Sequence, residues 1–158
     1  MHYDTYVRNF HDMDAIDRAI IDELRRDARL SNTELAQRIR LTPAPCLRRV
    51  KRLEQEGVIT GYHARVDPAA AGRPFEVTVS VEIRVNDQRT VEEFESSVAA
   101  WEEVVEVRRV FGSPDYILRV LVADVGEYER FQTAKLLRLD GVSRTISHQT
   151  MKLVKQEW

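Results

Sequence analysis

The chain has 158 residues, of which 43% are hydrophobic and 32% charged, with six glycines and five prolines. These proportions exclude collagen-like, low-complexity and disordered chains. No apolar run reaches the roughly 18 to 20 residues that span a bilayer, and the start lacks the layout of a signal peptide, so we expect a cytoplasmic protein. The single cysteine, Cys46, and four scattered histidines predict neither a disulfide nor a metal site.

The formal net charge of −2 is unevenly distributed along the chain. Residues 1–66 contain 12 basic and 10 acidic residues, whereas residues 67–158 contain 12 basic and 16 acidic residues. The segment from Arg38 to Leu53 contains six basic residues and no acidic one. A local basic patch on a nearly neutral chain is typical of a protein that binds DNA.

The first part of the chain predicts three helices. Residues 1–12 show no periodicity and form an N-terminal arm to which we assign no function. Apolar side chains then recur every four positions (Ile16, Ile20 and Leu24), which predicts an amphipathic helix from Asp14 to about Ala28 or Arg29. Ser31 and Glu34 form a capping box that starts a second, short helix, which extends to about Arg40.

The third helix begins at Pro43, because Thr42 is a good N-cap residue and proline loses no hydrogen bond at the first helical position. Gly57 ends it, where a left-handed conformation is favoured. We expect its buried side to consist of Cys46, Leu47, Val50 and Leu53. On that side Cys46 is far better explained as a small buried residue than as a redox sensor.

The second part of the chain predicts an α+β domain. A strand over residues 58–66 leads to a linker that ends at Pro74, and apolar residues then alternate from Phe75 to Ile83 as in a strand. A helix over 91–101, strands over 104–111 and 116–123, a helix over 125–139 and a last strand from 142 to about 154 complete a ferredoxin-like βαββαβ order. We therefore divide the chain into an arm (1–12), a helix-turn-helix domain (13–60), a strand and linker (61–74), and a βαββαβ domain (75–158).

The strand over 116–123 is apolar on both faces apart from Arg119, so two helices on one side of the sheet cannot cover it. A second subunit packed against the open face is the simplest cover, which predicts a homo-oligomer.

The short second helix, the turn and the basic third helix together predict a helix-turn-helix that binds double-stranded DNA. We expect Arg48 and Arg52 to contact bases, because arginine bonds guanine with two hydrogen bonds, and Arg49, Lys51 and Arg38 to contact the backbone. The predicted DNA-binding residues are Thr42, Ala44, Pro45, Arg38, Arg48, Arg49, Lys51 and Arg52. The alternative is a basic helix face that only meets solvent.

One loop of the second domain, residues 111–116, joins two strands through Gly112 and Pro114. Exposed amides and the Asp115 carboxylate in such a loop suit the charged groups of a small zwitterion. A plain hairpin turn explains the same residues and is favoured on the residues alone. The chain contains no Gly-rich phosphate loop and no nucleophile elbow, so we expect no enzyme activity and no cofactor.

Several stretches resemble the Lrp/AsnC family of regulators: Met13–Ile20, Leu30–Ala36, Leu41–Glu54, Gly57–Tyr62 and Phe111–Val120. The resemblance covers nearly the whole chain after residue 12, and the stretch Pro43–Glu54 is highly specific. It implies DNA binding, pairing of subunits through their sheets, and assembly of dimers into octamers or related rings. It also implies that an amino acid or similar effector binds between dimers, near residues 112–115 (Gly112, Ser113, Pro114 and Asp115) and facing residues 147–150, with Ser147 and Thr150 as the candidates.

Two positions depart from the family pattern. The turn before the third helix has Arg40 where the family commonly has glycine, so a left-handed conformation there costs about 1 kcal/mol. Pro114 removes an amide from the loop over 112–115.

We expect a DNA-binding transcription regulator that responds to an effector. One alternative is an architectural protein that compacts DNA without an effector. A third is a regulatory subunit of an amino-acid enzyme, which predicts no DNA binding.

Overall fold

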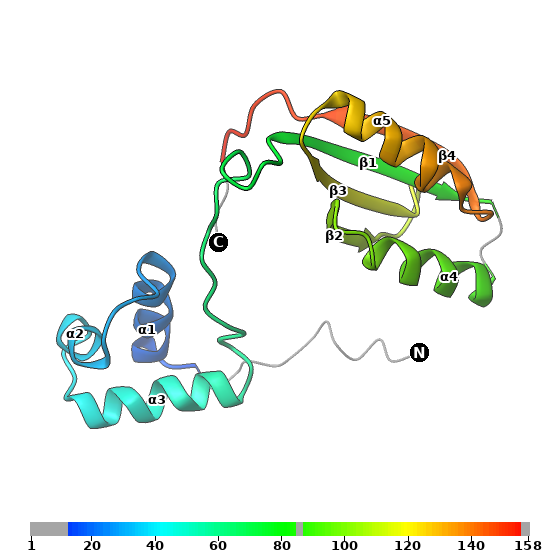
Figure 1. Cartoon of the computed structure of the whole chain (residues 1–158). Helices are drawn as coiled ribbons and strands as arrows, with labels where there is room; N and C mark the ends of the chain where they lie inside the picture. Colours follow the sequence, from blue (N-terminus) through cyan, green and yellow to red (C-terminus); the bar gives the residue numbers. More distant parts are fainter. Residues whose placement is uncertain (1–12, 85–86, 156–158) are drawn as a thin grey trace. The chain divides into compact units, whose positions relative to one another are not determined.

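The computed structural model describes residues 13–84 and 87–155 as two compact units, which divide between Ala64 and Arg65 (Figure 1). The first unit contains α1 (Ala15–Arg26), α2 (Asn32–Arg38) and α3 (Pro43–Gln55). The second contains β1 (Phe75–Ile83), α4 (Gln88–Ala99), β2 (Val104–Arg109), β3 (Tyr116–Val122), α5 (Val125–Ala134), the 3-10 helix η1 (Leu136–Arg138) and β4 (Val142–Gln149). Within the described ranges, every helix is too short or too polar to cross a membrane. The predicted N-terminal arm lies outside the described residues.

Local capping signals determine where the helices of the first unit begin and end. Asp14 and Ser31 each accept a hydrogen bond from the third residue of the helix that follows, and the side chains of Asp17 and Glu34 bond back to them. Gly57 has a φ of 68°, the left-handed conformation expected after α3. The three helices then bury one common core of Ile20, Leu35, Ala36, Cys46 and Leu53.

The strand expected over residues 58–66 does not form, and this prediction is wrong. Between α3 and β1 the chain has no strand, and a turn follows at residues 68–72. The turn is closed by hydrogen bonds from the Ala71 amide to the Asp67 carbonyl at 3.0 Å and from the Arg73 amide to the Pro68 carbonyl at 2.8 Å. A strand needs a neighbour for its backbone hydrogen bonds, and the described chain provides none for this segment.

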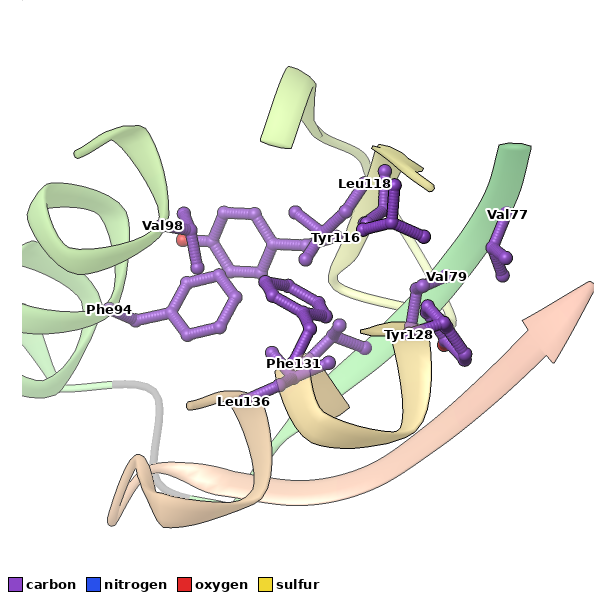
Figure 2. Close-up of a cluster of buried hydrophobic side chains, with 12 residues drawn as sticks. Val77, Val79, Phe94, Val98, Tyr116, Leu118, Tyr128, Phe131 and Leu136 are labelled. Carbon is purple, nitrogen blue, oxygen red and sulfur yellow. The ribbon is translucent and has the colours of Figure 1, made fainter. Parts of the chain in front are cut away.

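The second unit has the predicted βαββαβ order, in a four-stranded antiparallel sheet with strand order β2-β3-β1-β4. Alternate residues of β1 and β3 pack with side chains of α4, α5 and η1 (Figure 2). The sequence prediction differs from the structure in one break within a helix and in the ends of several elements. The helix expected over 125–139 divides into α5 and η1, and β4 ends at Gln149 instead of near residue 154.

The other face of the sheet is half-exposed. On β3 the residues Tyr116, Leu118, Val120 and Val122 are buried, while Ile117, Arg119 and Leu121 between them are only partly covered. Arg119 lies near two carboxylates of this face, 3.6 Å from Glu76 and 3.4 Å from Glu106. Two partly covered aliphatic residues therefore remain on an open face within one chain.

Candidate DNA-binding and ligand-binding sites

The turn before α3 sets the start of the basic helix. Arg40 has a φ of 58°, which is the left-handed conformation considered for this position. Thr42 has the extended backbone of an N-cap, but its side chain makes no capping hydrogen bond. Pro43 is the first helical residue, and its carbonyl accepts a hydrogen bond of 2.8 Å from the side-chain amide of Asn32 in α2. The start of α3 is thus joined to the preceding helix.

The exposed side of α3 is a stripe of Ala44, Leu47, Arg48 and Lys51. These positions are spaced by three and four residues, so they lie on consecutive turns of one helix face. Leu47 was expected in the core, and that prediction is wrong because the residue is 42% exposed. The buried stripe runs instead through Cys46, Val50 and Leu53, and neighbouring residues of a helix are about 100° apart.

Three of the predicted DNA-binding arginines bond acidic residues of α1. Arg49 Nη1 lies 2.9 Å from Asp17 Oδ1, and Arg52 Nη2 lies 2.5 Å from Asp17 Oδ2. The expected outward orientation of Arg49 and Arg52 is therefore wrong. Arg38 Nη1 lies 2.9 Å from Glu23 Oε2, and this guanidinium is the main cause that lowers the pKa of Glu23.

Arg48 and Lys51 differ from these three residues. Both side chains are exposed, and neither has an acidic partner among residues 13–84 and 87–155. At the amino end of the helix Thr42 and Ala44 are exposed and Pro45 is half-buried. The structure therefore brings together Thr42, Ala44, Arg48 and Lys51 from the predicted set, and adds Leu47.

The loop at residues 111–115 is a tight connection between β2 and β3. The Val110 amide bonds the Asp115 carbonyl at 2.9 Å, and Gly112 has a φ of 102° with open space where a Cβ would stand. Asp115 Oδ2 accepts a hydrogen bond of 2.8 Å from the Ile83 amide at the end of β1. Ser113 Oγ donates to Glu82 Oε1 at 2.9 Å. The carboxylate thus caps a neighbouring strand, as in the plain hairpin reading, and its Oδ1 has no partner within the described chain.

The two predicted halves of the effector site lie far apart in one chain. The loop lies near Val81 and Ile83, at the end of β1, whereas the amide of Thr150 bonds the carbonyl of Glu76, near its start. Val81 and Glu76 are five positions apart along the strand, which is roughly 17 Å at about 3.3 Å per residue. Ser147 lies opposite Val79, between the two, and its hydroxyl is bonded to Tyr128 Oη. One ligand of amino-acid size cannot contact both the loop and Thr150 in a single chain.

Sequence reasoning missed two features of the first unit. Leu47 was given to the core because leucine is usually buried, and the apolar pattern of Ile16, Ile20 and Leu24 did not point to Asp17, which is fully buried. The capping box with Asp14 was a possible signal for Asp17, but its arginine partners are 32 and 35 residues away. Within the described ranges no three His, Cys, Asp or Glu residues are grouped as a metal site.

Comparison with known proteins adds to this geometry. Residues 13–60 match a family model for winged helix-turn-helix DNA binding, and residues 76–157 match the Lrp/AsnC ligand-binding domain. The Leucine-responsive regulatory protein of Haemophilus influenzae is 42% identical over 144 residues, which cover 91% of this chain and 87% of the relative.

Solved structures agree in fold. A transcriptional regulator of Neisseria meningitidis, described as a complex with L-Met, matches with a TM-score of 0.88 and 32% identity, over 92% of this chain and 94% of the other. A regulator of the AsnC family from Agrobacterium tumefaciens matches with a TM-score of 0.86 and 31% identity, over 92% and 94%.

A winged helix-turn-helix and a ligand-binding domain in one chain define a DNA-binding transcription regulator that responds to a small molecule. The relatives named above are likewise described as regulators. The chain belongs to the Lrp/AsnC family.

Proposed function

We propose that the chain reads double-stranded DNA with the exposed face of α3, through Leu47, Arg48 and Lys51. One observation carries this proposal: of the four basic residues of α3, Arg49 and Arg52 are paired with Asp17, whereas Arg48 and Lys51 are exposed without an acidic partner among the described residues. The Arg48 guanidinium suits a bidentate contact with guanine, and Lys51 suits a phosphate. Ala44 is small and exposed at the amino end of the helix, where the backbone can approach DNA closely.

The proposed effector is an amino acid that binds at the loop formed by Gly112, Ser113, Pro114 and Asp115. Asp115 Oδ1 has no partner in the described chain and suits an ammonium group, while the absence of a side chain at Gly112 leaves open space beside the backbone. The L-Met in the regulator of Neisseria meningitidis supports an amino acid as the class of ligand. Because a transcription regulator works where the DNA lies, we place the protein in the cytoplasm.

The proposed assembly is a homo-oligomer whose subunits pair through the open face of the sheet. Ile117 and Leu121 lie on this face and are only partly covered. A second subunit also resolves the separation of the two halves of the effector site, because the loop of one subunit can face Ser147 and Thr150 of another. A dimer places two α3 helices about 34 Å, or a multiple, apart on DNA, which predicts pseudo-palindromic binding sites.

Selection of bound sequences from a random DNA pool tests the DNA-binding proposal. Arg48→Ala should then cost about 1–3 kcal/mol on the selected site, with a much smaller loss on random DNA. Arg18→Ala is a matched control that should keep both affinities, because the Arg18 side chain lies in α1 and, among the described residues, bonds only the Met13 carbonyl. Equal affinities of Arg48→Ala and the parent chain for the selected site would refute the assignment.

Thermal unfolding with each common amino acid tests the effector proposal. A ligand at about 100 times its Kd should add roughly 2.7 kcal/mol of stability. Asp115→Asn keeps an oxygen acceptor for the Ile83 amide but removes the charge, so the shift should vanish while the fold remains. If no amino acid shifts the unfolding of the parent chain, the effector proposal fails and DNA binding stands alone.

A further inference from the structure

Asp17 is a buried carboxylate beneath the basic helix. It is fully buried, and no other charged side chain in the described ranges shares that property. A buried charge is costly unless it is paired and hydrogen-bonded, so its partners are informative. Both oxygens are bonded to α3, with Oδ1 accepting from Arg49 Nη1 and Oδ2 from Arg52 Nη2.

A second carboxylate completes the cluster. Asp14, the N-cap of α1, accepts a hydrogen bond of 2.8 Å from Arg49 Nη1 through Oδ2. The hydrogen bond to Asp17 is the largest cause that raises the pKa of Arg49, and the bond to Asp14 comes next. Two carboxylates of α1 therefore face two guanidinium groups of α3, and the four charges cancel within the unit.

The cluster also restricts where the arginines can reach. The side chain of Arg49 is 28% exposed and that of Arg52 is 41% exposed, so neither is sealed from solvent. Their charged ends nevertheless turn to α1, and Arg52 Nε is buried without a hydrogen bond. Of the four basic residues of α3, only Arg48 and Lys51 project from the helix without an acidic partner in the described chain.

We propose that Asp17 is a positioning residue for DNA recognition, which holds Arg49 and Arg52 on α1 and so withholds two positive charges from DNA. The proposal rests on the proposed function, in which the exposed face of α3 contacts DNA. Its effect is on specificity, because contacts with phosphates strengthen binding to every sequence whereas base contacts distinguish sequences. Fewer phosphate contacts from α3 leave Arg48 and Leu47 a larger share of the binding free energy.

Neighbouring substitutions on α3 give the first test. Lys51→Gln and Arg52→Gln remove the same charge from adjacent positions, and Arg49 stays on Asp17 in both variants. The slope of log Kobs against log salt concentration falls by about 0.9 for each lost phosphate contact. We expect Lys51→Gln to make the slope shallower by about 1.8 in a dimer and Arg52→Gln to leave it unchanged.

Each outcome of this test has one meaning. A change for Arg52→Gln as large as that for Lys51→Gln would overturn the inference, because Arg52 would then contact phosphate in the complex. If neither Lys51→Gln nor Arg48→Ala changes DNA binding, the proposed function fails instead, since α3 would not be the DNA-contacting helix.

Release of the arginines gives the second test. Asp17→Asn removes the charge but keeps the size of the side chain. Among the described residues, Arg49 then keeps only Asp14 as an acidic partner, and Arg52 keeps only Glu56, whose Oε1 lies 4.0 Å from its Nε. Both arginines are held less tightly and should strengthen binding to random DNA. We expect a steeper salt dependence, by up to about 0.9 for each freed arginine that contacts a phosphate, and a smaller ratio of selected-site to random-site affinity. Asp22→Asn is the matched control, because Asp22 is an exposed residue of α1 with no ion pair to α3.

A merely structural role predicts a different pattern for Asp17→Asn. Binding to selected and random DNA would weaken together with stability, and the salt dependence would not steepen; this result would overturn the inference. The double variant Asp17→Asn/Arg52→Gln should restore part of the parent slope if Arg52 is one of the freed charges. If Asp17→Asn does not fold, the comparison of Lys51→Gln with Arg52→Gln decides the matter alone.

Discussion

Leu47 should contact a thymine methyl group in the DNA complex. The residue is 42% exposed. It lies between Ala44 and the cations Arg48 and Lys51, on the face proposed to enter the major groove. Thymine is distinguished in that groove by its C5-methyl group, which favours apolar contacts. Burying one such carbon is worth about 0.8 kcal/mol, which corresponds to roughly a fourfold change in affinity.

A double cycle isolates this contact. Deoxyuridine in place of thymidine removes only the methyl group, and Leu47→Ala removes most of the side chain. We expect the parent protein to bind the uracil-containing selected site about fourfold more weakly, and Leu47→Ala to bind both DNAs equally. Because Leu47 is only partly covered, the variant should lose much less stability than the 2–5 kcal/mol of a buried leucine. If Leu47→Ala loses affinity but still distinguishes thymine from uracil fourfold, the methyl contact is refuted.

Three further predictions concern the first unit. Arg40→Gly should raise its free energy of unfolding by about 1 kcal/mol in chemical denaturation followed by circular dichroism, because φ is 58° there; Arg40→Ala, still strained, should not, and equal stability of the two variants would contradict this. The pKa of Asp14 is lowered chiefly by a backbone amide of α1, and that of Glu23 by Arg38, from ordinary values of 3.8 and 4.5. At pH above these ordinary values each ionised carboxylate stabilises the folded unit, and this stabilisation is lost as the pH falls through the lowered pKa of the folded state. Glu23→Gln should therefore flatten the acid limb of a curve of unfolding free energy against pH. Burial raises the pKa of the Cys46 thiol, so a thiol reagent at neutral pH should react much more slowly with folded than with urea-unfolded protein, and equal rates would place the thiol at the surface.

Local signals predicted most of the fold. The capping box at Ser31, the Thr42–Pro43 start and the stop at Gly57 act within one helical turn, so they can be read without knowledge of the rest of the chain. Alternation of apolar residues likewise predicted β1, because the pleat of a strand places every second side chain on the same face. Elements with such signals lie within a few residues of their predicted limits.

The orientation of α3 depended on contacts that no local pattern contains. Whether Leu47 or Val50 faces the core depends on the angle at which α3 packs on α1, and a shift of one residue turns a side chain by about 100°. The prediction that Arg52 points away from α1 could not take Asp17 into account, because this partner is 35 residues away in the sequence. The strand expected over residues 58–66 failed for a related reason, since its pattern was suitable but no strand lies beside it in the described chain.

The separation of the effector residues has a thermodynamic consequence. If a ligand contacts the Asp115 loop and also Thr150, at opposite ends of β1, the contacts come from two subunits, because one chain places them roughly 17 Å apart. A ligand held by two subunits binds the assembled form more tightly than the separate chains, so it must also stabilise the assembly. Since the spacing of the α3 helices on DNA is set by assembly, the same linkage allows an amino acid to change DNA affinity without touching α3.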